Sequence, residues 1–286
     1  MTDKPPKYDP DWVSRYFDEL GEGEWDRLIR SPVDEVNLHI HSELLKQYLK
    51  SGMEVLEIGA GAGRFTQVIA DLGCRITVAD LSGRQLQLNR EKASDLGFAS
   101  AITGWHRLDV CDMEVFQPDR FDAAVCYGGP ISYVFDQAEV ALSECRRVLT
   151  AEGRFLCSVM SLWGSVHRFL KGVLEVPPDF NRIIVETGDL TPDTEPGNKH
   201  RCHMFRSGEF RELLDRCGFQ ILEMSAANFL SIQREAELME IRKDEVRWNE
   251  LLRFEREACR EPGCLDSGTH LIAACRLAEV GKLDRG

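Results

Sequence analysis

The sequence has no long apolar run and no excess of basic residues. No stretch approaches the roughly 20 apolar residues that a membrane-spanning helix needs. The chain has 35 Lys and Arg residues against 48 Asp and Glu residues, which gives a formal net charge of −13. Without a basic face, a protein forgoes the counterion release that drives binding to nucleic acid. We therefore expect neither a membrane nor a nucleic acid as partner, although a locally basic groove is not excluded.

The first residues also lack the apolar core of a signal peptide, since Met1–Pro10 reads MTDKPPKYDP. The ten cysteines are scattered singly along 286 residues, a length at which a buried core needs no disulfides. Both features favour reduced thiols in a cytoplasmic protein. The sequence leaves a monomer and a homodimer open.

The chain divides into two patterns. Apolar residues recur at helical spacing between residues 11 and 49, which predicts an N-terminal helical cap over residues 1–50. From residue 51 onward short apolar runs alternate with helical segments of about ten residues, which is typical of a parallel sheet with helices on both faces. The predicted strands of this second part, residues 51–286, are 54–59, 75–80, 104–108, 121–126, 153–159, 219–224 and 269–276.

Two segments interrupt this alternation. Residues 160–206 contain several prolines and glycines and form a long insertion. A second insertion, at about residues 228–266, contains a long charged helix over 231–260 that is broken once. Extra segments of this kind could enclose a pocket.

A glycine-rich turn follows the first predicted strand. The run Glu57-Ile-Gly-Ala-Gly-Ala-Gly63 has the spacing G-x-G-x-G, and Arg64 stands where a dinucleotide fingerprint would have its third glycine. Glycines let the backbone turn tightly and approach a ligand closely. Glu57 would repel a pyrophosphate but attract a cationic ligand, so a nicotinamide dinucleotide is disfavoured.

Two further carboxylates are expected at the same rim of the sheet. Asp80 ends the second strand, where it can accept hydrogen bonds from both ribose hydroxyls of a ligand. Asp109 follows the third strand, where it can accept one from an adenine amino group. Three carboxylates around a glycine turn fit a ligand with a ribose, an adenine and a positively charged end.

In these motifs residues 53–159 resemble the class I S-adenosylmethionine-dependent methyltransferases. The turn from Glu57 matches the first motif of that family, and Val78-Ala-Asp-Leu-Ser82 matches the second, with Leu81 next to the acid. The resemblance implies a Rossmann-like α/β sheet of seven strands in the order 3-2-1-4-5-7-6, with strand 7 antiparallel. It also implies S-adenosylmethionine as cofactor and S-adenosylhomocysteine as product. Glu57, Gly59, Gly61 and Gly63 would face the methionine, Asp80 the ribose, and Asp109 and Val110 the adenine.

The segment after the fourth strand, Cys126-Tyr-Gly-Gly-Pro-Ile-Ser-Tyr133, favours a small-molecule acceptor. DNA amine methyltransferases of the family carry an Asn/Asp-Pro-Pro-aromatic motif here, and this chain does not. The methyl group would go to an O, N or S atom. A peptide or protein methyltransferase is an alternative, and so is a non-catalytic cofactor-binding partner protein.

Several candidate residues have two interpretations. Tyr127 would contact the cofactor or pack a loop, Tyr133 has the same alternatives, and Tyr16 would close over the cofactor or pack within the cap. His200 and His203 lie in the first insertion, where either would be the general base or a structural residue. Although His200-Arg-Cys-His203 suggests metal ligands, no second pair at a familiar spacing completes a site, so we assign no metal.

Overall fold

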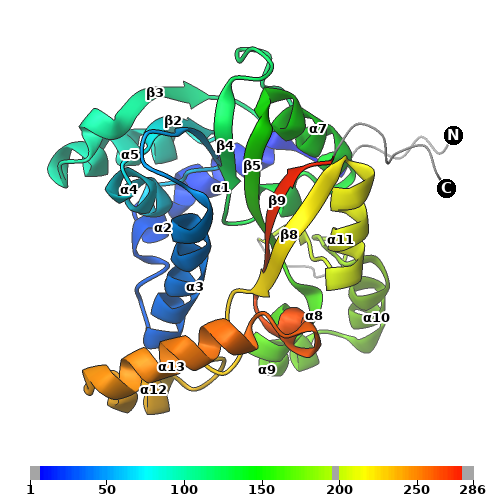
Figure 1. Cartoon of the computed structure of the whole chain (residues 1–286). Coiled ribbons are helices and arrows are strands. Elements are labelled where there is room, and N and C mark those ends of the chain that lie inside the picture. Colours follow the sequence, from blue (N-terminus) through cyan, green and yellow to red (C-terminus); the bar gives the residue numbers. More distant parts are fainter. Residues whose placement is uncertain (1–6, 195–199, 279–286) are drawn as a thin grey trace, which may run out of the picture.

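The computed structural model describes residues 7–194 and 200–278. Its centre is a seven-stranded sheet in the order β3-β2-β1-β4-β5-β9-β8 (Figure 1). The first five strands are parallel, and β9 is antiparallel to both β5 and β8. Counted along the chain within this sheet, the order is 3-2-1-4-5-7-6, so the predicted fold class is confirmed. The strands are β1 (Glu54–Ile58), β2 (Arg75–Asp80), β3 (Ile102–Arg107), β4 (Phe121–Cys126), β5 (Leu149–Met160), β8 (Phe219–Ala226) and β9 (His270–Leu277).

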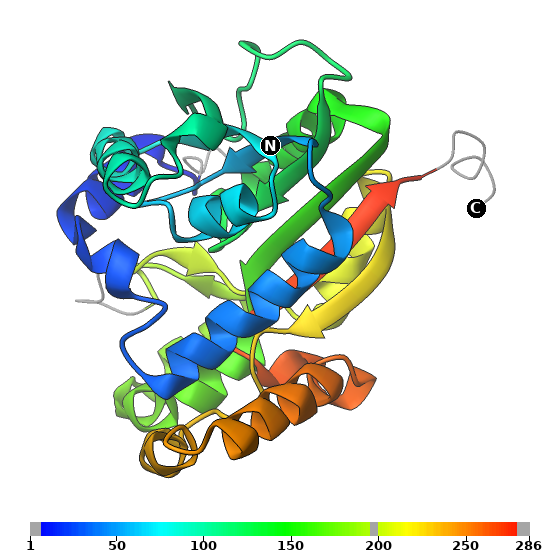
Figure 2. The same ribbon diagram turned by 60° about the vertical axis from the view of Figure 1, so that its left-hand side comes forward.

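Helices cover both faces of the sheet, which explains why the central strands are apolar runs. One face packs against α7 (Ala138–Val148) and α11 (Ser207–Arg216). The other face packs against α3 (Pro32–Tyr48), α4 (Arg64–Asp71) and α5 (Gly83–Asp95). Figure 2 shows α3 lying diagonally across the sheet.

The helices of the first fifty residues lie in two places. The sequence starts α1 (Pro10–Leu20) with a proline in the first turn and with Asp9, whose side chain accepts from the Trp12 N–H. This helix and the single turn α2 (Gly23–Asp26) lie over the sheet's carboxyl-end rim, whereas α3 belongs to the layers of the core. The first six residues of the predicted cap lie outside the described part.

The first insertion is more regular than its prolines and glycines suggest. Its described residues, 160–194 and 200–206, contain three short helices and a two-stranded antiparallel sheet. Proline starts one of the helices, as its fixed φ allows at the first turn. The elements are α8 (Leu162–Arg168), α9 (Leu170–Glu175), α10 (Pro178–Thr187), β6 (Asp189–Leu190) and β7 (Cys202–His203).

The predicted break in the charged helix is present. The segment forms α12 (Glu235–Ile241) and α13 (Glu245–Ala258), and between them Asp244 caps α13 by accepting from two backbone N–H groups. Both helices lie beside α3 at one end of the molecule (Figures 1 and 2). Among the described residues, no helix combines the length and the apolar character needed to cross a lipid bilayer.

Candidate functional site

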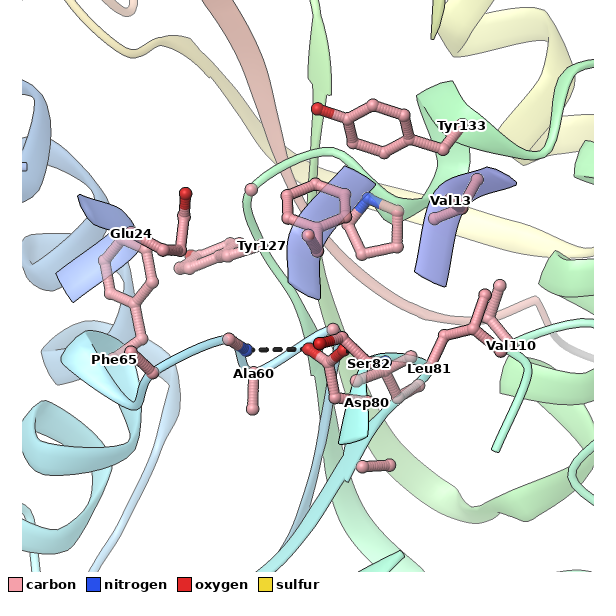
Figure 3. Close-up of a pocket in the computed structure, with 18 of the residues that line it drawn as sticks. Val13, Glu24, Ala60, Phe65, Asp80, Leu81, Ser82, Val110, Tyr127 and Tyr133 are labelled. Atoms are coloured by element: carbon pink, nitrogen blue, oxygen red, sulfur yellow. Dashed lines mark hydrogen bonds between the residues drawn. The ribbon is translucent and has the colours of Figure 1, made fainter. Parts of the chain in front are cut away.

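A cavity lies at the carboxyl ends of the central strands, beneath α1 (Figure 3). It is lined by the turns that follow β1, β2, β3 and β4. Seven of the ten residues predicted to bind the cofactor line this cavity: Gly59, Gly61, Asp80, Leu81, Asp109, Val110 and Tyr127. The remaining three, Tyr16, Glu57 and Gly63, lie outside its lining.

The glycine turn requires glycine for its backbone conformation. The φ angles of Gly59, Gly61 and Gly63 are +65°, +55° and +99°, a region that residues with a Cβ atom rarely adopt. A Cβ atom on Gly61 would lie 3.4 Å from Cγ of Glu24, which comes from α2. Gly63 caps α4, and its Cβ would come within 2.8 Å of the Asn89 amide. The turn is therefore packed closely between α2 and α5.

Asp80 is placed by the turns on either side of it. Its Oδ2 accepts from the Gly61 N–H and its Oδ1 from the Ser82 N–H, both at 2.8 Å. Burial raises the pKa of Asp80 to about 6, although these two hydrogen bonds act in the opposite direction. The carboxylate is thus oriented rigidly towards the cavity in which Ser82 and Leu81 also lie (Figure 3).

Asp109 contacts the N-terminal segment. Its Oδ2 accepts from the Tyr8 hydroxyl at 2.7 Å, and its Oδ1 accepts from the Cys111 N–H at 2.8 Å. Tyr8 itself lines the cavity. A residue from outside the sheet therefore reaches the acid that the sequence assigns to the adenine, and no motif in the sequence indicated this contact.

Helix α1 is fastened over the cavity on the side of β2. Ser14 donates to the Leu81 carbonyl oxygen at 3.4 Å, and Gln85 donates to the Phe17 carbonyl oxygen at 2.8 Å. Asp18 accepts from the hydroxyl of Ser82. These bonds join α1 to the start of α5, so the helix closes the cavity from above.

Glu57 carries the strongest sign of a missing cationic partner. Its side chain is buried behind the glycine turn, and its Oε2 has no hydrogen-bond partner among the described residues. Burial raises the pKa of Glu57 to about 8. An unpaired buried carboxyl oxygen is costly, and an ammonium group near the turn would relieve that cost. Asp80 and Asp109 in the lining of the cavity, with Glu57 behind the glycine turn, therefore fit a ligand with a ribose and a positively charged end.

An aromatic wall closes the cavity opposite Asp80. Tyr127 packs edge to face against Phe65, with ring centroids 5.2 Å apart, and against His41 at 4.8 Å. The Tyr127 hydroxyl is buried and has no partner among the described residues. Phe65 and Tyr127 lie on the same side of the cavity as Glu24 (Figure 3). A sulfonium or ammonium ion is attracted to such aromatic faces.

No motif in the sequence indicated that Glu24, in α2, and Arg27, the C-cap residue of α2, lie at this site. Arg27 donates through Nε to Glu24 Oε1 at 2.8 Å, and both side chains line the cavity. A Cβ atom on Gly128 would lie 3.7 Å from Arg27 Nη2. Since α2 is a single turn without a motif, only the tertiary structure indicates that this ion pair lies above the end of β4.

A second cavity of about 1130 Å³ lies next to the first, between α1, α2 and the insertion. Cavities of about 300–1,000 Å³ hold drug-sized ligands. Its walls are mostly apolar and include the helices α8, α9 and α10. The two cavities share the residues Phe17, Glu24, Arg27, Leu28, Gly128 and Tyr133.

His200 and Tyr16 meet at the wall of this second cavity. The Tyr16 hydroxyl lies 3.1 Å from His200 Nδ1, and the Tyr133 ring centroid lies 5.7 Å from that of His200. Burial and the nearby Arg27 charge lower the pKa of His200 to about 4. The imidazole is therefore neutral at pH 7. Tyr16, predicted for the cofactor, lies on the side of the second cavity instead.

His203 has a different environment from His200. Its Nδ1 lies 2.7 Å from Asp189 and its Nε2 lies 2.8 Å from Glu209, so both ring nitrogens are engaged. These two carboxylates raise the pKa of His203 to about 9, overcoming the opposite effect of burial. His203 lines neither cavity. A protonated, doubly bound imidazole links β6, β7 and α11 and is unsuited to accept a proton.

This pairing predicts a pH-dependent contribution of His203 to stability. Because the folded pKa lies above the ordinary value, the stabilisation is complete below pH 6.5 and is lost as the pH rises through 9. We expect His203→Gln to lower the free energy of unfolding by about 1–3 kcal/mol at pH 6 and much less at pH 10. Urea unfolding at both pH values measures the difference, and exposed His167→Gln is the control. A gap between wild type and His203→Gln that stays constant from pH 6 to 10 would contradict this account.

The residues at 200–203 do not gather a metal-ligand set. Across residues 7–194 and 200–278, no group of three or more His, Cys, Asp or Glu side chains is arranged to hold a metal ion. All ten cysteines are free thiols, and most of them are buried in the core.

Comparison with known proteins agrees with the motifs. A family model described as a methyltransferase domain matches residues 55–153. A protein of Geobacillus sp. (strain WCH70) that is named for a methyltransferase activity is 23% identical over 225 residues, which cover 71% of this chain and 88% of that protein.

Solved structures share the fold at low sequence identity. The 1,6-didemethyltoxoflavin-N1-methyltransferase of Burkholderia thailandensis, crystallised with 1,6-didemethyltoxoflavin and S-adenosylhomocysteine, is 16% identical. Its TM-score is 0.58 over 94% of this chain and 88% of that chain. The CcbJ methyltransferase of Streptomyces caelestis is 15% identical, with a TM-score of 0.56 over 84% of this chain and 89% of that chain.

The likenesses to solved structures describe the fold, while the family model describes one part of the chain. The match over residues 55–153 spans the strands that carry Glu57, the glycine turn, Asp80 and Asp109. Residues 55–153 therefore match a methyltransferase domain, and the cofactor of such domains is S-adenosylmethionine.

Proposed function

We propose that this chain transfers the methyl group of S-adenosylmethionine to a small-molecule acceptor that binds in the second cavity. The observation that carries the proposal is the junction of the two cavities at Gly128, beyond the end of β4. A donor in the first cavity and an acceptor in the second would meet there. Much of the rate enhancement of such a reaction can come from holding the two reactants in line.

In this proposal the first cavity holds the cofactor through the residues assigned from the sequence. Asp80 accepts from the ribose hydroxyls, and Asp109 and the Val110 backbone contact the adenine. The glycine turn and Glu57 face the methionine end. When bound, S-adenosylmethionine supplies a methyl group already activated by a sulfonium centre.

The acceptor side of the proposal rests on His200. Its neutral imidazole lines the second cavity, and although a pKa of about 4 makes it a weak base, it can accept the proton of a hydroxyl or thiol, which becomes strongly acidic as the methyl group bonds to it. The Tyr16 hydroxyl at Nδ1 orients the ring. His203 is bound on both nitrogens, so we no longer assign it a catalytic role.

The proposal predicts different effects for the two histidines. Transfer of a tritiated methyl group to a panel of hydroxy acids, phenols, amines and thiols would first identify an acceptor. With that acceptor, His200→Ala should lower turnover by roughly 10²–10⁴-fold and leave the affinity for S-adenosylhomocysteine unchanged. His203→Ala should lower thermal stability with little change in rate. Full turnover in folded His200→Ala would remove the base assignment, and turnover on peptides alone would favour the peptide methyltransferase alternative.

A further inference from the structure

The charged groups at the junction of the two cavities indicate which kind of acceptor fits. Among the described residues, six charged side chains line the second cavity, three of each sign: Glu24, Arg27, Arg30, Asp34, Arg168 and Glu175. Arg30 donates to the Gly23 carbonyl oxygen, and Arg168 pairs with Glu235. Of the three cations, Arg27 alone also lines the first cavity.

The Arg27 guanidinium has hydrogen-bonding capacity left. Its Nε and Nη2 both contact the same oxygen of Glu24, at 2.8 and 2.7 Å. Among the described residues, its Nη1 forms no hydrogen bond. The side chain keeps 36% of its surface accessible although it lines both cavities. A guanidinium can hold a carboxylate through two parallel N–H donors.

Glu24 and Asp34 face Arg27 and raise its pKa against the effect of burial. His41, His200 and His270 all have a lowered pKa, first because they are buried and also because of the Arg27 charge. They are neutral at pH 7. Arg27 therefore contributes a positive potential at these rings, which would also act on an anion placed beside its Nη1.

The cofactor would increase this preference. S-adenosylmethionine carries a sulfonium, an ammonium and a carboxylate, so its binding adds one net positive charge beside Arg27. In a cavity shielded from water, that charge is less screened than at a surface. Asp80 and Asp109 offset the charge of the cofactor as a whole, so the attraction for an anion would come from the sulfonium, which faces the junction in the proposed function.

The rest of the second cavity is mostly apolar, with aromatic side chains in its walls. Phe17 and Tyr133 pack edge to face at 5.2 Å where the cavities meet, and Met160, Phe169 and Ile184 line the further walls. Such walls suit a planar hydrophobic body. The aromatic walls and the charge of Arg27 together indicate which kind of molecule fits the second cavity.

We propose that the second cavity binds a flat, largely apolar acceptor that carries one anionic group, and that the Arg27 guanidinium binds this group beside Gly128. The anionic group is the recognition element, and the methylated hydroxyl, amine or thiol is a neighbouring atom. The inference rests on the proposed function, because it assumes that acceptor and cofactor share the junction.

Three naphthalene derivatives, which share one ring system and differ in charge, test the preference of the second cavity for an anion. In the presence of saturating S-adenosylhomocysteine, calorimetry would measure the Kd of 2-naphthoate, 2-naphthamide and 2-naphthylmethylamine, whose charges are −1, 0 and +1. We expect 2-naphthoate to bind at least about tenfold more tightly than the other two, as a charge-assisted hydrogen bond predicts. Arg27→Gln should abolish this preference, and Arg27→Lys should keep part of it.

The matched control is Arg15→Gln, an equal change of charge at an exposed residue of α1 that lies in neither cavity. It should leave the preference for 2-naphthoate intact. The Kd of S-adenosylhomocysteine is measured separately for each variant, so a loss of cofactor binding would count against the proposed function itself. Normal cofactor binding with equal affinities, with a preference for the amine, or with no binding of any probe would overturn the anionic-acceptor proposal.

Discussion

Gly61→Val should abolish binding of S-adenosylhomocysteine, whereas Gly97→Val should leave it intact. Both glycines have positive φ angles, +55° and +80°, so valine strains the backbone at both positions. A Cβ atom on Gly97 would meet open space. At Gly61 it would approach Glu24, and the strained turn would no longer present its N–H to Asp80.

The expected loss of affinity for Gly61→Val is more than about 100-fold, since several contacts at the turn change together. Calorimetric titration measures it, and circular dichroism at the same temperature confirms that both variants are folded. Both substitutions place a valine at a positive φ angle. Comparing the two affinities therefore separates the effect of backbone strain from the effect of contact with the ligand. A folded Gly61→Val protein that binds as tightly as Gly97→Val would show that the turn has a structural role only.

Asp80→Ala should weaken the binding of S-adenosylhomocysteine by roughly 10- to 150-fold. The proposed reason is the loss of a charge-assisted hydrogen bond to the ribose, which is worth about 1.5–3 kcal/mol. Since burial raises the pKa of Asp80 to about 6, the carboxylate is protonated as the pH falls below that value. The affinity of the wild-type protein for S-adenosylhomocysteine should therefore fall between pH 7 and 5. The affinity of Asp80→Ala should not show this fall.

Asp95→Ala is the control for Asp80→Ala. Asp95 is an exposed acid at the end of α5, so its removal changes the net charge without touching the cavity. Thermal unfolding of both variants measures any loss of stability, because Asp80 also accepts from the backbone of Gly61 and Ser82. An unchanged affinity in folded Asp80→Ala would contradict the ribose assignment.

The sheet and the glycine turn could be predicted because their signals are local. A buried strand followed by closely spaced glycines constrains the backbone within a few residues, and Asp80 ends the next strand at the same rim. The seven-strand order followed from the resemblance. Its last two strands were found from short apolar runs at 219–224 and 269–276.

The sequence predicted that extra segments could enclose a pocket, but not which residues line the second cavity, because its walls come from segments far apart in the chain. Arg27 follows a single helical turn, and its place beside Gly128 depends on how that turn packs over β4. His200 and His203 are three residues apart, yet one lines the cavity and the other lies between two carboxylates. Only the register of β6 with β7 distinguishes the two environments.

The most direct test of the account is a crystal structure of the protein with S-adenosylhomocysteine. We expect the ligand in the first cavity, with its ribose hydroxyls bonded to Asp80, its adenine beside Val110, and its amino group near the glycine turn. The sulfur should face Gly128, where the second cavity opens. A ligand bound elsewhere, or one whose sulfur points away from Gly128, would contradict the proposed site and the route of methyl transfer into the second cavity.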